Sequence, residues 1–421
     1  MKNILVIFGF FISGISFAKD YKFELGKQLF FDKVLSGNKN ISCATCHHPK
    51  LGTGDNLPLS VGEGGSGLGS YRRLGYNTDG VKPLVPRNAP PLFNLGIIKN
   101  FPLFHDGRIE FNDNYPSGIK SPAGHLLPEG LESSLAAQAL FPVTSHVEMA
   151  GQEGDNKIAD FAAKEDFKGV WKEVTKRVQN LNGYVEQFRA TYSEIKTKED
   201  IGIHHIGNAI GHFEDKAFRS VDSPYDRYLK GEYWSLNMEA MRGMSLFYGK
   251  AQCYTCHYGK FQTDGKFHSL ALPHLGPGKN KGVDGKEDFG RELVTKNRED
   301  RYKFRTPSLR NVALTGPWGH NGAYSNLRDI VRHHLDPETS LLNFNSAHLN
   351  GNVVTEDNIP FAGDHSINKM LLASNDLPRV ELSEEEMDNI IEFLHALTDL
   401  RPMGFKKLIP LSVPSGLSLE D

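Results

Sequence analysis

The chain has 421 residues, of which 39% are hydrophobic and 24% are charged, a composition typical of folded globular proteins and not of disordered or fibrous ones. This length is enough for about two ordinary domains. The 48 Lys and Arg nearly balance the 51 Asp and Glu, for a net charge of -3, and no basic block stands out. We therefore expect no nucleic-acid partner and no polybasic membrane contact.

The first 18 residues have the pattern of a signal peptide. Lys2 supplies the positive charge, an apolar run covers residues 4–15, and Ser16–Ala18 offers a small-x-small cleavage site. The apolar run is too short for a comfortable membrane span. We expect residues 1–18 to be removed on export and the mature protein to be soluble in a bacterial periplasm.

All four cysteines fall in two C-x-x-C-H pentads, at residues 43–47 and 253–257. Such a pentad attaches a c-type haem, because its cysteines form thioethers and its histidine ligates the iron. A redox C-x-x-C pair and a zinc half-site are the alternatives, and both leave the following histidines unexplained. The pentads predict two covalently bound haems c. The attachment residues are Cys43, Cys46, Cys253 and Cys256, and the iron ligands are His47 and His257.

A weak internal repeat precedes the pentads. Gly26-x-x-Leu29-Phe30-Phe31 stands before the first, and Gly243-x-x-Leu246-Phe247-Tyr248 before the second. Each is typical of the end of an amphipathic helix that packs on its haem. A further helical pattern, from about residue 200 to 218, ends before Pro224. We predict two tandem haem domains over residues 19–222 and 223–405, followed by a C-terminal tail over 406–421.

The remaining pattern is helical, with long loops between helices. Residues 57–80 are rich in glycine, residues 84–102 are rich in proline, and no run of alternating strands is present. Ser383-x-x-Glu386 forms a capping box before an apolar helical face that extends to Leu397. The predicted fold class is all-α, with two tandem cytochrome-c-like haem domains and long loops.

For the second haem, histidine is the candidate sixth iron ligand. No Met occurs between Met244 and Met370, whereas His333 and His334 stand in a helical stretch over residues 327–335. An imidazole there would give a lower reduction potential than a thioether. Two solvent-facing histidines are the alternative.

For the first haem, no His or Met occurs from Pro49 to Phe104. This gap favours an iron atom with one open face, which could bind peroxide. Glu148 and His146 are acid–base candidates for that face. Surface positions for both residues are the alternative.

Together, these features resemble the bacterial dihaem cytochrome c peroxidases and the related MauG-type dihaem oxidases, over nearly all of the mature sequence. Besides the pentads, the resemblance rests on four motifs. They are Asn88-Ala-Pro-Pro-Leu-Phe-Asn94, Phe104-His-Asp-Gly-Arg108, Gln138-x-x-x-Pro142-x-x-x-x-x-Glu148-Met149, and Phe304 to Val312 leading into Thr315-Gly-Pro317-Trp-Gly-His-Asn-Gly322.

The resemblance implies the cofactor ligands and the peroxide site. Gln138, Pro142 and Glu148 match the residues over the open face of the N-terminal haem, and Glu148 is the expected acid–base. His334 matches the sixth ligand of the C-terminal haem. Asn88, Thr315 and Pro317 match the ligands of a calcium ion between the domains, and such oxygen ligands suit calcium.

Three departures from the family pattern stand out. His105 occupies the position of the Trp that bridges the two haems, which puts fast electron sharing through this position in doubt. His334 replaces a Met or a Tyr, which implies a lower reduction potential. Residues 109–131 look like an insertion that reshapes access to the open haem.

Three functions remain open. The leading one is a peroxidase that reduces hydrogen peroxide with electrons from a small c-type cytochrome or a cupredoxin. The second is a MauG-like oxidase of a protein or organic substrate, and the third is a dihaem cytochrome that only transfers electrons. Dimerisation is common in the family, so a homodimer is one of the expected assemblies.

Overall fold

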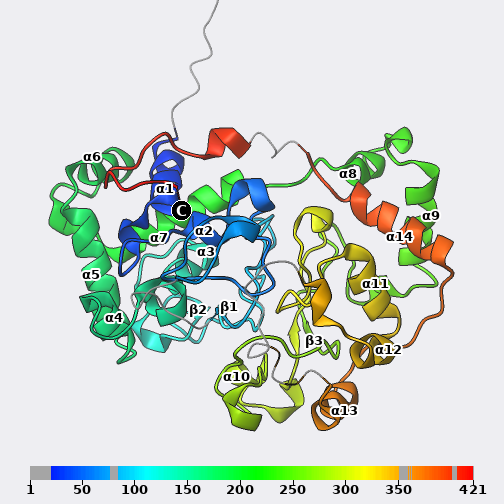
Figure 1. Ribbon diagram of the computed structural model, residues 1–421. Helices are drawn as coiled ribbons and strands as arrows, with labels where there is room; N and C mark the ends of the chain where they lie inside the picture. The colour runs from blue at the N-terminus through cyan, green and yellow to red at the C-terminus, as the bar shows by residue number, and fades with distance from the viewer. Residues whose placement is uncertain are drawn as a thin grey trace, which may run out of the picture.

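The structure is a computed structural model that describes residues 20–75, 84–349, 359, 361, 363–400 and 405–420 (Figure 1). The predicted signal peptide, residues 1–18, lies outside the described residues. None of the described helices is long and apolar enough to cross a membrane. The helices are α1 (Tyr21–Phe31), α2 (Cys43–Cys46), α3 (Ser134–Gln138), α4 (Lys157–Ala162), α5 (Phe167–Gln179), α6 (Asn182–Thr191), α7 (Ile203–Ala217), α8 (Pro224–Leu229), α9 (Met238–Phe247), α10 (Glu292–Thr295), α11 (Leu327–Leu335), α12 (Pro337–Leu342), α13 (His365–Ala373) and α14 (Glu384–Ala396).

Two short antiparallel ladders are the strands of the described part of the chain. β1 (Glu110–Phe111) pairs with β2 (Ile119–Lys120), and β3 (Phe267–His268) pairs with β4 (Phe304–Arg305). The fold is therefore mostly helical with little sheet, as predicted. The first ladder lies within the expected insertion, residues 109–131.

The two glycines of the sequence repeat lie at helix crossings. A Cβ atom on Gly26 of α1 would stand 1.9 Å from the backbone oxygen of Ala209 on α7. A Cβ atom on Gly243 of α9 would stand 1.8 Å from the backbone oxygen of Asn389 on α14. In both places only glycine lets the two backbones approach this closely. The repeat thus marks two equivalent helix pairs, one before each pentad.

Two large hydrophobic cores follow the order of the chain. The first is built from residues 25–218 together with Val413, and the second from residues 225–397. A smaller cluster joins Leu57, Leu59, Val61 and Leu84 of the first half to Leu275 of the second. We call this cluster, where the two halves of the chain meet, the seam.

The C-terminal segment returns to the first half of the molecule, where Figure 1 shows it in red near α1. Val413 is buried in the first core. The Ser415 hydroxyl donates a hydrogen bond of 2.7 Å to the carboxylate of Asp32, just after α1. The predicted tail, residues 406–421, therefore packs against the first core over its described residues.

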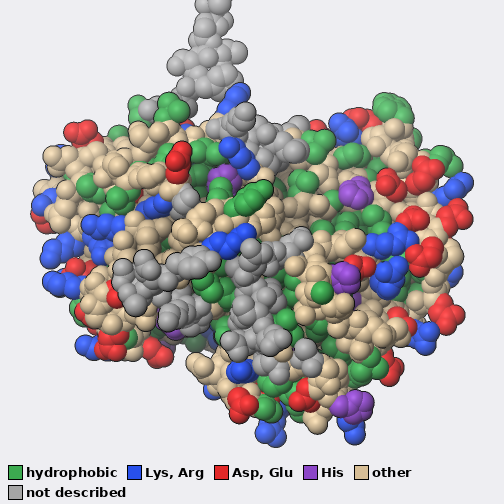
Figure 2. Space-filling view, viewed as in Figure 1, with side chains coloured by type: hydrophobic (Ala, Val, Ile, Leu, Met, Phe, Trp, Pro, Cys, Tyr) green, Lys and Arg blue, Asp and Glu red, His purple; other side chains and the backbone are tan. Residues whose placement is uncertain are grey.

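A buried ion-pair network also joins the two halves. The Arg87 guanidinium lies 2.7 Å from Asp106 and 2.6 Å from Asp288. Burial alone would raise the pKa of both carboxyls, but Arg87 holds the pKa of each far below its ordinary value. On the outer surface, acidic and basic side chains are interspersed over the face seen in Figure 2.

Candidate haem sites

The first pentad opens onto a cavity in the first half of the molecule. α2 carries Cys43 and Cys46, and His47 follows directly after it. The Nδ1 of His47 donates to the backbone oxygen of Thr53 at 3.1 Å, which leaves Nε2 as the free ligand atom. Burial lowers the pKa of His47, so its ring is neutral, as a metal ligand must be.

The predicted peroxide-site residues line this same cavity. Gln138, Pro142 and Glu148 lie around it together with Cys43, Cys46 and His47. Here the structure brings together residues from α2, from the end of α3 and from the segment that follows α3. His146, the second acid–base candidate, is instead exposed and does not line the cavity.

Glu148 lies in a short π-helix, His146–Ala150. The backbone just before Glu148 is held by a distant segment, because the Glu63 backbone N–H donates to the backbone oxygen of Val147 at 3.1 Å. A Cβ atom on Gly62 would stand 1.9 Å from the same oxygen, so glycine is needed there. π-helical turns are rare and occur frequently at functional sites.

The second pentad opens onto a cavity in the second half. Cys253, Cys256 and His257 line it, and so does His334 of α11. The ring centroids of His257 and His334 are 6.4 Å apart. Two imidazoles on opposite sides of one metal, each with a metal–nitrogen bond of about 2 Å, place their centroids about 6 Å apart. The spacing of the two rings therefore suits two ligands of one metal ion, and His257 and His334 would hold a haem iron between them.

The hydrogen bonds of this pair point to the same arrangement. The Nδ1 of His257 donates to the Gln262 backbone oxygen at 3.0 Å, and that of His334 to the Ile330 backbone oxygen at 2.8 Å. Both Nε2 atoms are left for a metal. Burial lowers the pKa of both rings, to about 4 for His257, and keeps them neutral.

His333 has a different environment from its neighbour. Its ring is fully buried, with Nδ1 2.8 Å from the Tyr324 hydroxyl and Nε2 2.6 Å from the Leu270 backbone oxygen. Both nitrogens are therefore used within the protein. Of the two candidates in α11, only His334 has a nitrogen free for iron.

His105 lies between the two cavities and lines both. Its Nε2 is 3.0 Å from the backbone oxygen of Asn88, which also lines both. Burial, and then the charge of Arg87, lower the pKa of His105 to about 3, so its imidazole is neutral. A neutral imidazole therefore stands between the two cavities, at the position where the family pattern has Trp.

The three predicted calcium ligands lie around the second cavity. Asn88, Thr315 and Pro317 all line it, although they are far apart in the sequence. The Asn88 side-chain nitrogen donates to the Leu57 backbone oxygen at 2.6 Å. Its side-chain oxygen is therefore the atom left for a cation, and an amide oxygen with two backbone oxygens would suit calcium.

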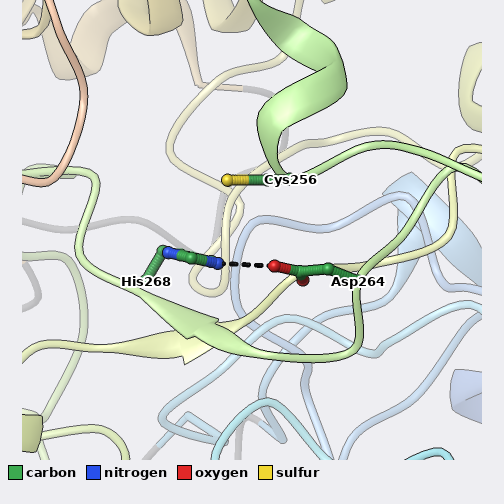
Figure 3. A group of neighbouring side chains, drawn as sticks. All are labelled: Cys256, Asp264 and His268. Carbon is green, nitrogen blue, oxygen red and sulfur yellow. Dashed lines mark hydrogen bonds and ion pairs between the residues drawn. The ribbon is translucent and has the colours of Figure 1, made fainter.

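Cys256, Asp264 and His268 form a cluster beside the second pentad (Figure 3). His268 lies 2.9 Å from Asp264. Such a cluster could hold a metal ion only while the Cys256 sulfur is free, and a thioether to haem removes that thiolate. Metal binding by this cluster and the predicted haem attachment of Cys256 therefore exclude each other.

Sequence reasoning missed three charged residues at the first cavity: Glu214 of α7, Lys279 and Arg305. Glu214 is fully enclosed, and burial raises its pKa to about 8. Arg305 lies in the motif from Phe304 to Val312, but that motif predicted no place for it in this cavity, and no motif marks Glu214 or Lys279. The helical pattern over residues 200–218 predicts that Glu214 lies on a helix, but it does not predict that the Glu214 side chain lines a cavity.

The chain is similar to several known proteins. The sequence profile of the family described as di-haem cytochrome c peroxidase matches residues 20–233. Methylamine utilization protein MauG of Methylorubrum extorquens is 32% identical over 315 residues, which cover 75% of this chain and 68% of that protein. Cytochrome c551 peroxidase of Pseudomonas aeruginosa is 26% identical over 389 residues, which cover 92% and 82%.

Solved structures show the same fold. A MauG-like protein associated with microbial copper homeostasis has a TM-score of 0.59 and 24% identity, with 93% of this chain and 92% of that chain covered. The diheme peroxidase BthA from Burkholderia thailandensis has a TM-score of 0.58 and 20% identity, with 96% and 91% covered. The likeness extends over both halves of the molecule.

Proposed function

The chain belongs to the di-haem cytochrome c peroxidase family, and on this basis we propose that it reduces hydrogen peroxide to water at the haem on His47, with electrons that enter at the haem on His257. When bound, the first haem supplies an iron atom that takes the peroxide and delivers the electrons for cleavage of the O–O bond. The protein supplies ligands, an enclosed cavity and a proton carrier.

One asymmetry between the two cavities carries the proposal. His257 has a second imidazole, His334, at the distance expected across a metal. Among the described residues, no imidazole ring stands in this relation to His47, and the residues that share its cavity include Gln138, Pro142 and Glu148. A site with one strong ligand and a polar group opposite suits catalysis, whereas two strong ligands suit electron transfer.

Glu148 is the proposed acid–base. Its carboxylate would take a proton from the peroxide oxygen nearer the iron and return it to the oxygen that leaves as water. Gln138 would hold the peroxide through its side-chain amide. Pro142 offers no donor and would keep that part of the wall apolar.

The remaining assignments belong to the same proposal. The two hydrophobic cores support two tandem cytochrome-c-like domains, and the oxygen donors of Asn88, Thr315 and Pro317 support a calcium ion. We also infer a periplasmic protein whose donor is a small c-type cytochrome or a cupredoxin. A homodimer is the assembly that we would test first.

A MauG-like oxidase is the second candidate. The chain is 32% identical to MauG, and the imidazole of His334 would stabilise the oxidised state of the second haem. Such a haem would favour the storage of oxidising equivalents for a protein or organic substrate. Under this alternative the same two cavities hold the haems, but the electrons come from a protein or organic substrate and not from a small redox protein.

The test is spectroscopic. The oxidised protein with both haems attached should contain one high-spin and one low-spin haem, and micromolar hydrogen peroxide should change only the high-spin signal. A turnover assay with a reduced small cytochrome then separates a peroxidase from a MauG-like oxidase. Two low-spin signals that ignore peroxide would show an electron-transfer protein and refute the proposal.

A further inference from the structure

Two cations at the first cavity have no carboxylate partner. Lys279 and Arg305 both line it, and Arg305 lines the second cavity as well. Neither forms an ion pair within the part of the chain that the structure describes. The other two cations of the cavity are paired, Arg87 with Asp106 and Asp288, and Arg108 with Asp106 at 3.1 Å. Burying a cation without a counter-ion costs free energy. Two such cations at one cavity therefore indicate a binding site for anions.

Lys279 reaches the cavity from the second half of the chain. Leu275 anchors its loop in the seam against Leu57 and Leu59. The Lys279 backbone N–H then donates to the Glu287 backbone oxygen at 3.0 Å. Gly278 has φ +70°, and a Cβ atom there would stand 2.2 Å from the Lys286 carbonyl carbon, so the loop closes only with glycine. The lysine is therefore presented by a fixed turn.

Arg305, at the end of β4, is held equally firmly. Its Nε donates to the Phe104 backbone oxygen at 3.2 Å, and its guanidinium carbon lies 4.2 Å from the centre of the Phe101 ring. Its backbone N–H donates to the His105 backbone oxygen at 2.8 Å. These contacts fix the charged group against the first half of the chain, although they supply no negative charge.

Burial dominates the electrostatics of both cations, and no carboxylate forms an ion pair with either one among the described residues. Burial, and then the neighbouring Arg87 and Arg108, lower the pKa of Lys279 to about 8. Burial lowers the pKa of Arg305 to about 10. Glu148 also lines the cavity, but it forms no ion pair with either cation in the described part of the chain. Lys279 and Arg305 are thus the two cations of this cavity that have no ion-pair partner over the residues that the structure describes.

A haem c carries two propionate carboxylates, which match these two positive charges. We propose that Lys279 and Arg305 bind the propionates of the haem attached at Cys43 and Cys46. This assignment rests on the haem site proposed above. Because both cations come from the second half of the chain and both cysteines from the first, the haem would be held from both sides of the seam.

Potentiometry of the protein with both haems attached tests this assignment. Lys279→Gln removes one positive charge near the first haem, which should favour its ferric state by roughly tenfold, a fall of about 60 mV for a one-electron couple. Lys279→Arg keeps the charge and should restore the potential. Lys281→Gln, an exposed lysine of the same loop, is the matched control and should leave both potentials unchanged.

Resonance Raman bands of the haem propionates provide a second measurement, since they report directly on the partners of the carboxylates. Lys279→Gln should shift these bands for the first haem only. Unchanged bands and an unchanged potential, or a shift confined to the haem on His257, would overturn the assignment. Neither measurement uses peroxide, so loss of the proposed peroxidase function would not be mistaken for failure of this one.

Discussion

The Nε2 of His105 donates a hydrogen bond to the backbone oxygen of Asn88, 3.0 Å away, where the two haem cavities meet. The acceptor is a carbonyl oxygen, so Nε2 must carry the proton. The neutral ring is therefore held by the same residue whose side chain is proposed to bind calcium. This links the bridge between the haems to the ion site.

We predict that His105→Trp speeds electron transfer between the two haems by about tenfold or more. An indole is much easier to oxidise than an imidazole, so it can relay an oxidising equivalent between the cavities. Flash photolysis or stopped-flow reduction of the half-reduced protein measures this rate. His105→Phe has similar bulk and no such relay, so equal rates in the two variants would refute a relay role. Overpacking should cost about 1–3 kcal/mol in either variant.

Glu148→Gln should slow peroxide turnover by roughly 10²-fold or more, the usual scale for loss of a general acid–base. The amide keeps the size of the side chain but cannot accept a proton from peroxide. Steady-state assays with a reduced cytochrome measure the loss, and the spectra should show both haems still attached. His146→Gln, two residues away but exposed, is the control. Full activity in Glu148→Gln would remove this residue from the mechanism.

Local sequence patterns predicted the elements whose signals lie within a few residues. The helix expected over 327–335 is α11, Leu327–Leu335, and the Ser383–Glu386 capping box starts α14. The pattern from about 200 to 218 is α7, Ile203–Ala217. Apolar spacing marks all three helices, and a side-chain cap also starts α11 and α14; both signals can be read without knowing the fold.

What the patterns could not predict depends on contacts between distant segments. Lys279 and Arg305 enter the first cavity only because the seam brings the second half against the first. The return of Val413 to the first core has no local signal either. The π-helix that carries Glu148 was missed because its backbone is held by Glu63, far away in sequence.

His334→Met should convert the second haem from bis-imidazole to imidazole–thioether ligation. Its reduction potential should rise, because thioether ligation raises it. Potentiometry with near-infrared spectra, which detect iron–sulfur ligation, provides the measurement. His333→Gln is the control, since both nitrogens of His333 are bound within the protein. It should lower stability by about 1–3 kcal/mol and leave the low-spin signal of the second haem in place. If His333→Gln removed the low-spin signal and His334→Met left the second haem unchanged, His333 would be the ligand.

Glu214 gives the stability of the protein a particular dependence on pH. Its pKa is raised by burial to about 8 in the folded state, whereas an unfolded glutamate titrates near about 4.3. Below about pH 4 both states are protonated, so the residue has no effect on stability. Between about pH 4 and pH 8 only the unfolded state releases the proton, so stability falls by about 1.4 kcal/mol for each pH unit. Above pH 8 the loss is complete.

Glu214→Gln should remove this dependence, because the amide has the same shape and does not ionise. The variant should gain stability over the parent by a few kcal/mol more at pH 8 than at pH 5, by about 1.4 kcal/mol per unit. Urea unfolding of the protein with both haems attached, at these two pH values, measures the difference. Glu186→Gln on the exposed face of α6 is the matched control and should show no such change. An equal difference at both pH values would mean that the pKa of Glu214 is the same in the folded and unfolded states, which would refute the prediction.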